Sequence, residues 1–94
     1  MKAYVVEQGK LVLKHLPKPM PKNENHVIIK VKAFGLNRAD LLQMEGLYPA
    51  PDNSNIPGLE VVGILEGTEH RVAALLPSSG YAEYVSVDKR HIIK

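Results

Sequence analysis

The clearest pattern along the chain is a period of two between residues 26 and 33, where apolar residues occupy every second position. The apolar side of this segment comprises Val27, Ile29, Val31 and Ala33. The other side carries two lysines and Ile28. Because successive side chains of a strand point to opposite faces, this alternation predicts a half-buried β-strand.

Five further segments are short, rich in β-branched or aromatic residues, and bounded by Gly, Pro, Asn or Ser. They span residues 1–7, 10–16, 59–65, 71–76 and 81–87. These features favour strands, and several short strands at close spacing are typical of a sandwich or a barrel. The pattern therefore predicts a mainly β domain.

One segment, residues 37–46, departs from the strand pattern. It begins with Asn37, a favoured N-cap residue, has Asp40 in the capping-box position, and ends at Gly46. The residues between them are mostly strong helix formers. We therefore expect a helix of about two turns here.

Length and composition narrow the class of protein. Ninety-four residues suffice for one domain, and the chain has no cysteine, which excludes disulfides and agrees with a cytoplasmic protein. Glu7 interrupts the N-terminal apolar run too early for a signal peptide, and no stretch is long enough to span a membrane. The 12 basic residues are scattered among 10 acidic ones, so neither nucleic acid nor a membrane is an expected partner.

The usual motifs for cofactor and metal binding are absent from the sequence. Its seven glycines include no Gly-x-Gly, so the chain has neither the dinucleotide fingerprint nor a phosphate-binding loop. Its four histidines lack the spacing of a zinc site and are expected on the surface. We therefore expect the isolated chain to bind no metal and no nicotinamide cofactor.

A set of motifs spread over nearly the whole chain carries a family resemblance. In order they are Met1-Lys2-Ala3, VKAFGLNRAD at 31–40, Gly46-Leu47-Tyr48-Pro49, IPGLE at 56–60 and GYAEYV at 80–85. In this order and spacing they resemble the N-terminal domain of zinc-free quinone oxidoreductases of the medium-chain dehydrogenase superfamily. The resemblance implies a GroES-like domain over residues 1–94, a strongly bent, partly open β-barrel with one or two short helices.

Two positions indicate which subfamily the chain resembles, the zinc-dependent or the zinc-free one. In zinc-dependent relatives a cysteine stands at the position of Asn37 and a histidine at the position of Leu59. An amide and an aliphatic side chain cannot replace a thiolate and an imidazole as zinc ligands. The resemblance is therefore to the zinc-free quinone and enone reductases, in which NADPH gives hydride directly to the substrate.

The resemblance also implies functional residues. In that family the cleft lies between the GroES-like domain and a Rossmann domain, and the residues that match Asn37 and Tyr48 face the nicotinamide and the substrate. Asn37 would thus contact the cofactor, and both side chains would stabilise the negative charge that hydride transfer builds on a carbonyl oxygen. From the residues alone, Asn37 is also explained as a helix cap and Tyr48 as a loop anchor. Asp40 and Glu60 are assigned to structure.

The resemblance implies that the cofactor-binding Rossmann domain is absent from these 94 residues. The chain is then expected to be inactive until a Rossmann domain, encoded separately, joins it and brings NADPH. The exposed inter-domain face is expected to favour a homo-oligomer. Two alternatives stay open: a free-standing GroES-like interaction module, and a non-functional remnant of a split gene.

Overall fold

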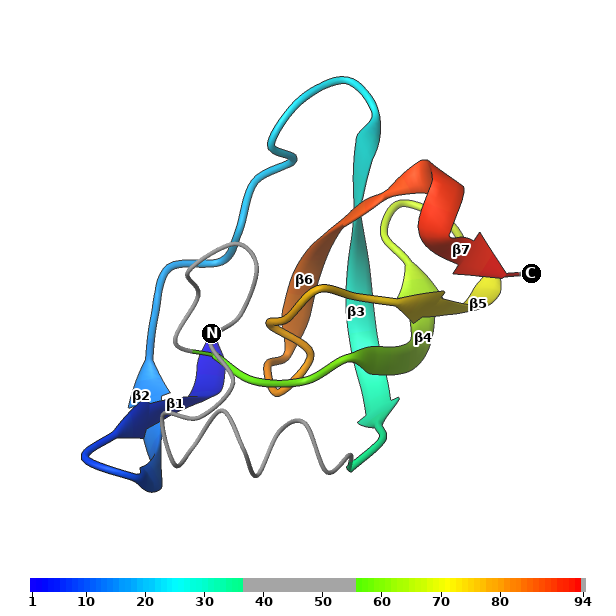
Figure 1. Cartoon of the computed structure of the whole chain (residues 1–94). Helices are drawn as coiled ribbons and strands as arrows, with labels where there is room; N and C mark the ends of the chain where they lie inside the picture. Colours follow the sequence, from blue (N-terminus) through cyan, green and yellow to red (C-terminus); the bar gives the residue numbers. More distant parts are fainter. Residues whose placement is uncertain (37–55, 94) are drawn as a thin grey trace.

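The computed structural model of the chain describes residues 1–36 and 56–93 (Figure 1). The elements in these ranges are β1 (Lys2–Glu7), β2 (Lys10–His15), β3 (His26–Phe34), β4 (Glu60–Leu65), β5 (Arg71–Leu75), β6 (Tyr84–Asp88), the 3₁₀ turn η1 (Lys89–His91) and β7 (Ile92–Ile93). The six expected strands are confirmed, with ends that differ by at most three residues, and β7 is an addition. The helix expected at residues 37–46 lies outside the described residues.

The strands form two antiparallel sheets. Five of them pair in the order β6-β3-β4-β5-β7, and β1 and β2 form a separate hairpin. The register of β3 on β4 shifts between Val31 and Ala33, and a bulge of this kind bends a strand. Figure 1 shows the larger sheet curled, with the hairpin set to one side. This curled half-barrel confirms the strongly bent, partly open barrel expected from the sequence.

A two-residue turn closes the β1–β2 hairpin. Gln8 and Gly9 have positive φ angles of 51° and 76°. Positive φ at both central positions is the geometry of a type I′ turn, whose twist suits an antiparallel pair. The backbone N–H of Tyr4 donates to the carbonyl of Tyr81 at 2.8 Å, and this bond ties the hairpin to the segment before β6.

The core is built from alternate residues of β3, β4, β5 and β6. Its members are Ile29, Val61, Val72, Ala74, Leu76, Val85 and Val87. Burial of each large side chain in this set contributes about 1.5–3 kcal/mol relative to leaving it exposed. Because the buried positions follow a period of two, the alternation seen in the sequence is what places them on one side of the sheet.

Burial along strand β3 departs from its alternation, since Ala33, on the side expected to be buried, is exposed. Ile28, on the side of the strand that also carries the lysines, is only 7% exposed. The connector between β2 and β3 lies against this region, because Lys18 is 2.5 Å from the carboxylate of Glu66 and 4.6 Å from the ring centroid of Tyr84. The backbone N–H of Glu66 in turn donates to the carbonyl of Ile28. At the adjacent residues Ile28 and Ile29, β3 is therefore buried on both sides.

Candidate functional site

The two residues predicted to act in catalysis, Asn37 and Tyr48, lie outside the described residues. Their roles stay predictions from the resemblance. The structure does describe the residues that flank this segment on both sides, and these show how the segment is attached to the barrel.

On the N-terminal side, the segment follows the end of β3. The ring of Phe34 lies 4.4 Å from the ring of Tyr81, centroid to centroid, with the planes tilted by 31°. The N–H of Gly35 donates to the carbonyl of Glu60 at 3.3 Å, and the Glu60 side chain lies over Gly35, where a Cβ atom would come within 2.0 Å of the carboxylate. A side chain at residue 35 would therefore require the flexible Glu60 side chain to move. Glu60 begins β4, and the structural role expected for its side chain stays a prediction.

On the C-terminal side, the backbone before β4 crosses the backbone before β6 at close range. The N–H of Gly80 donates to the carbonyl of Gly58 at 3.1 Å, and the N–H of Tyr81 donates to the carbonyl of Pro57 at 2.9 Å. Gly58 has a φ of +118°, and a Cβ atom there would lie 2.6 Å from the Cα of Gly80. Only glycine fits at residue 58. The sequence motifs contain both glycines but do not reveal that they touch.

Leu59 occupies the position at which zinc-dependent relatives carry a histidine. Its carbonyl accepts a hydrogen bond from the N–H of Leu76 at 2.8 Å, and its side chain has no atom that can coordinate a metal. Across residues 1–36 and 56–93 there is no group of three His, Asp or Glu side chains arranged to hold a metal ion.

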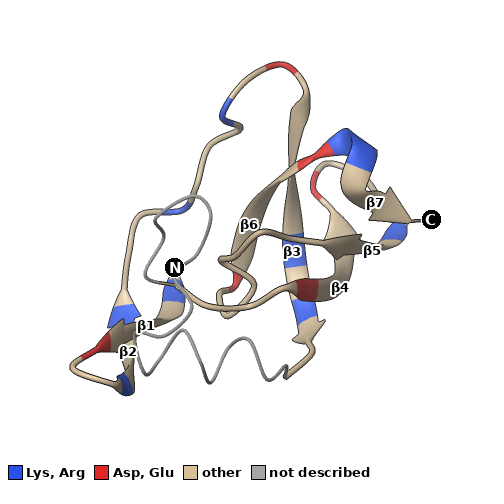
Figure 2. Ribbon diagram, in the orientation of Figure 1, with Lys and Arg blue, Asp and Glu red and all other residues tan. Residues whose placement is uncertain are grey.

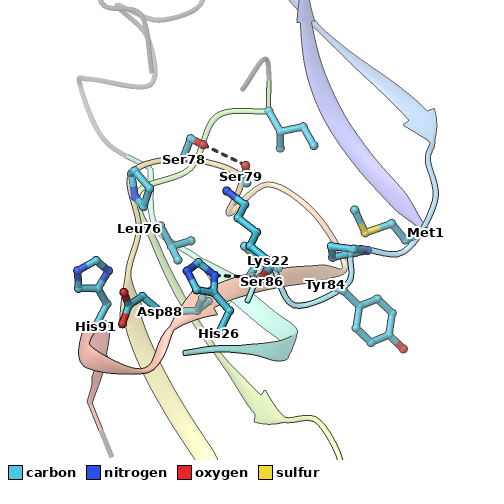
Figure 3. Close-up of a pocket in the computed structure, with 15 residues that line it drawn as sticks. Met1, Lys22, His26, Leu76, Ser78, Ser79, Tyr84, Ser86, Asp88 and His91 are labelled. Atoms are coloured by element: carbon cyan, nitrogen blue, oxygen red, sulfur yellow. Dashed lines mark hydrogen bonds between the residues drawn. The ribbon is translucent and has the colours of Figure 1, made fainter. Parts of the chain in front are cut away.

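A hollow of about 320 Å³, called the basic pocket below, opens between the connector, β3, the segment after β5 and the β6–η1 turn (Figure 3). Its basic lining residues are Lys22, His26 and His91, and its apolar lining includes Leu76, Val85 and Val87. His26 is half-buried, with Nδ1 3.2 Å from the hydroxyl oxygen of Ser86. This differs from the surface position expected for it, because strand pairing of β3 with β6 brings the serine beside it.

Asp88 is the acidic residue among the described residues that line the basic pocket. The Arg90 guanidinium donates to both of its carboxylate oxygens, at 3.1 Å from Nε to Oδ1 and 2.7 Å from Nη2 to Oδ2, and the Arg90 N–H donates at 2.9 Å. The side-chain hydrogen bonds of Arg90, followed by the backbone one, hold the pKa of the Asp88 carboxyl far below its usual range. The carboxylate therefore stays ionised, and its charge is offset by Arg90.

A second hollow, of about 450 Å³, is lined by residues of β3, β4, β5 and β7. A cross-strand row runs over it, in which Ala33 pairs with Val62, Val62 with Ala73, and Ala73 with Ile93. The large apolar side chains here, which we call the outer apolar face, are Phe34, Val62, Leu75 and Ile93, exposed by 38%, 52%, 58% and 59%. This is far more apolar exposure than the core-facing positions of the same strands show.

Charged residues are distributed over several elements. Figure 2 shows Lys and Arg on the connector, β3 and η1, with Asp and Glu between them. No helix of the described ranges is both long and apolar enough to cross a bilayer. The expectation that nucleic acid is not a partner stays a prediction.

Comparison with known proteins indicates the family of the chain, which the fold alone leaves open. The family described as the alcohol dehydrogenase GroES-like domain matches residues 23–78, which is more than half of the chain. The quinone oxidoreductase of Lama guanicoe is 38% identical over 77 residues, covering 70% of this chain and 23% of that protein. The acryloyl-coenzyme A reductase of Sulfurisphaera tokodaii is 44% identical over 69 residues, covering 70% of this chain and 20% of that protein.

Solved structures give the same result over nearly the full chain. The quinone oxidoreductase of Thermus thermophilus, solved alone and in complex with NADPH, has a TM-score of 0.86 and 43% identity to this chain. The similarity covers 99% of this chain and 32% of that one. The chain therefore spans between about a fifth and a third of the length of these relatives.

Proposed function

The chain belongs to the alcohol dehydrogenase GroES-like domain family, and we propose that it is the substrate-side domain of a zinc-independent NADPH:quinone or enone oxidoreductase. The observation that carries this proposal is the 43% identity to the Thermus thermophilus quinone oxidoreductase over 99% of the chain. That relative was solved with NADPH, which supports NADPH as the cofactor of the completed enzyme.

The proposal divides the work between two parts of the enzyme. The 94 residues contain no Gly-x-Gly, and the strands of the described residues do not form a strand–turn–helix, so we expect the pyrophosphate of the dinucleotide to be bound outside this chain. The remaining two thirds of the enzyme would hold the cofactor, and the isolated chain would be inactive. When bound there, NADPH supplies the hydride.

The contribution of this chain is to orient the substrate and to stabilise charge on it. Hydride addition to a quinone or an enone leaves negative charge on the carbonyl oxygen. Hydrogen-bond donors placed at that oxygen lower the barrier, and we assign this role to the Tyr48 hydroxyl and the Asn37 amide. The acryloyl-coenzyme A reductase relative supports the enone alternative, since its name implies a conjugated carbonyl substrate.

Two positions of the sequence, 37 and 59, support the proposed zinc-independence. Leu59 offers no ligand atom, and Asn37 offers an amide in place of a thiolate. Polarisation of the substrate carbonyl then has to come from hydrogen-bond donors, which is consistent with the roles given to Asn37 and Tyr48.

A chimera tests the proposed function. Residues 1–94 replace the matching third of the Thermus thermophilus quinone oxidoreductase, and NADPH oxidation is followed with 1,4-benzoquinone in a buffer that contains a metal chelator. We expect NADPH-dependent turnover at a rate within about tenfold of the parent enzyme, a difference of about 1.4 kcal/mol in the barrier. The matched controls are the parent enzyme and its remaining two thirds alone. A chimera that folds and binds NADPH but reduces neither benzoquinone nor an enone would contradict the proposal. Turnover that is present without the chelator and lost with it would contradict the zinc-independence.

The outer apolar face provides the basis for the expected oligomer. Val62 and Ile93 are each more than half exposed, and exposed apolar groups of this size favour association with a partner domain or a second copy. We expect the isolated chain to self-associate, with Val62→Lys weakening the dimer at least about tenfold because the ammonium would be desolvated in the interface. Sedimentation velocity over a concentration series measures this.

The control for self-association is Met20→Lys. Met20 is 80% exposed and lies in the connector, away from the outer apolar face, so this change should leave the dimer intact. A chain that sediments as a monomer at all concentrations would contradict the expected self-association. An equal effect of the two variants would show that the outer apolar face is not the interface.

A further inference from the structure

We propose that the connector between β2 and β3, residues 16–25, is a movable cover over one wall of the basic pocket, and that Lys18 holds this cover closed. Release of Lys18 would let the connector lift from β6 and would open the pocket wall to solvent. This device does not depend on the proposed redox role, which rests on Asn37 and Tyr48.

The connector supplies part of the pocket wall. Pro19 and Lys22 belong to the connector, and both line the basic pocket together with Tyr84 and Ser86 of β6. From residue 17 to residue 25, Pro19 is half-buried and the other residues are exposed. The middle of the connector therefore has little burial of its own to hold it, and its displacement would remove one side of the pocket.

The two ends of the connector are fixed by backbone hydrogen bonds. At its start the N–H of Leu16 donates to the carbonyl of Met1 at 2.8 Å, and at its end the carbonyl of Asn25 accepts from the N–H of Lys89 at 2.9 Å. Between these ends, the prolines at positions 17, 19 and 21 have no N–H to donate and favour an extended backbone. Segments with few buried apolar contacts are the ones that open locally at low free energy. The connector is such a segment, fixed at both ends (Figure 1).

Lys18 fastens the middle of the connector to the body of the domain. Its ammonium lies 2.5 Å from the carboxylate of Glu66, which follows β4, and 4.6 Å from the ring centroid of Tyr84 on β6. The hydrogen bond to Glu66 raises the pKa of the Lys18 ammonium, so Lys18 is charged at neutral pH. The Lys18 and Glu66 side chains are 46% and 42% exposed, and ion pairs this exposed are weak. The connector is thus held closed by contacts that a small change in charge can release.

Tyr84 links the contacts of Lys18 to the pocket. Its ring carries the Lys18 ammonium, and the residue lines the basic pocket. The next inward-facing residues of the same strand, Val85 and Val87, belong to the hydrophobic core as well as to the pocket wall. Their methyl groups therefore report on solvent access from the pocket side.

The test measures solvent access to this wall by nuclear magnetic resonance, with a neutral paramagnetic chelate added to the methyl-labelled chain. In Glu66→Gln we expect the relaxation enhancement at the Val85 and Val87 methyls to rise about two- to fivefold, the factor by which an exposed ion pair shifts an equilibrium. Lys18→Gln should have the larger effect, because it also removes the contact with the ring of Tyr84. Val72 belongs to the core but does not line the pocket, so its methyls should not change.

Lys14→Gln is the matched control. Lys14 pairs with Glu7 across the β1–β2 hairpin, and their side chains are 46% and 41% exposed, so this ion pair resembles that of Lys18 but lies outside the connector. The control variant should leave the Val85 and Val87 enhancements unchanged. Unchanged enhancements in both Lys18→Gln and Glu66→Gln, or an equal rise in Lys14→Gln, would overturn the proposal.

Salt gives a second readout that a purely structural role of Lys18 would not produce. Raising NaCl from about 0.05 M to about 1 M shortens the screening length to about 3 Å and weakens an exposed ion pair. We expect this change to raise the Val85 and Val87 enhancements in the unsubstituted chain and to have little effect in Glu66→Gln, in which the ion pair is already lost. An equal response to salt in the two chains would show that the ion pair does not hold the connector closed.

Discussion

Replacement of Gly58 by alanine is expected to lower the free energy of unfolding by about 2 to 6 kcal/mol, a large part of what a domain of this size has. Two costs add at this position. The φ of +118° is one that L-residues rarely adopt, and the new Cβ would lie 2.6 Å from both the Cα and the nitrogen of Gly80. Backbone atoms cannot move aside as a flexible side chain can. Urea denaturation followed by circular dichroism measures the change, with an unchanged slope expected for a purely native-state effect.

Gly67→Ala is the matched control for this prediction. Gly67 also has a positive φ, +82°, but a Cβ atom there would meet nothing within 4 Å. Its substitution should therefore cost only the conformational part, about 1 to 2 kcal/mol. Equal losses of unfolding free energy in the two variants would show that the close contact with Gly80 adds no cost. The close crossing of the two backbones would then not be what makes glycine necessary at residue 58.

Tyr48→Phe in the chimera with the Thermus thermophilus enzyme is expected to lower the turnover number about 10- to 1,000-fold, or about 1.4 to 4 kcal/mol in the barrier. The change keeps the ring and removes only the hydroxyl. If that hydroxyl stabilises the developing oxyanion, the Michaelis constant should change less than the turnover number. Single-turnover measurements with benzoquinone separate the chemical step from product release.

Tyr4→Phe serves as the control for Tyr48→Phe. Tyr4 lies on the β1–β2 hairpin and is 40% exposed, so loss of its hydroxyl should leave turnover unchanged. Turnover that is also unchanged in Tyr48→Phe, with chemistry rate-limiting, would reject the catalytic role and leave Tyr48 as a loop anchor. The chimera would still test the function of the whole domain in that case.

The strands were predictable from the sequence because they depend on local pattern. The alternation between residues 26 and 33 and the glycine- and proline-bounded apolar runs predict strands wherever they occur, and the six strands follow them closely. β7 was not predictable in this way, since Ile92–Ile93 is too short to show a period and exists because it pairs with β5. The motifs further identified the family, because their order and spacing along the chain are properties of the sequence alone.

The sequence by itself therefore determined six strands of the described residues, the family and the absence of zinc-ligand residues at positions 37 and 59. Only the tertiary structure decided which residues meet. Gly58 touches Gly80, His26 bonds Ser86, and Lys22 shares a pocket with His91, although each pair is distant along the chain. These contacts depend on strand order and on the curl of the sheet. A local period indicates which face of a strand is buried, but it carries no information on which other strand covers that face.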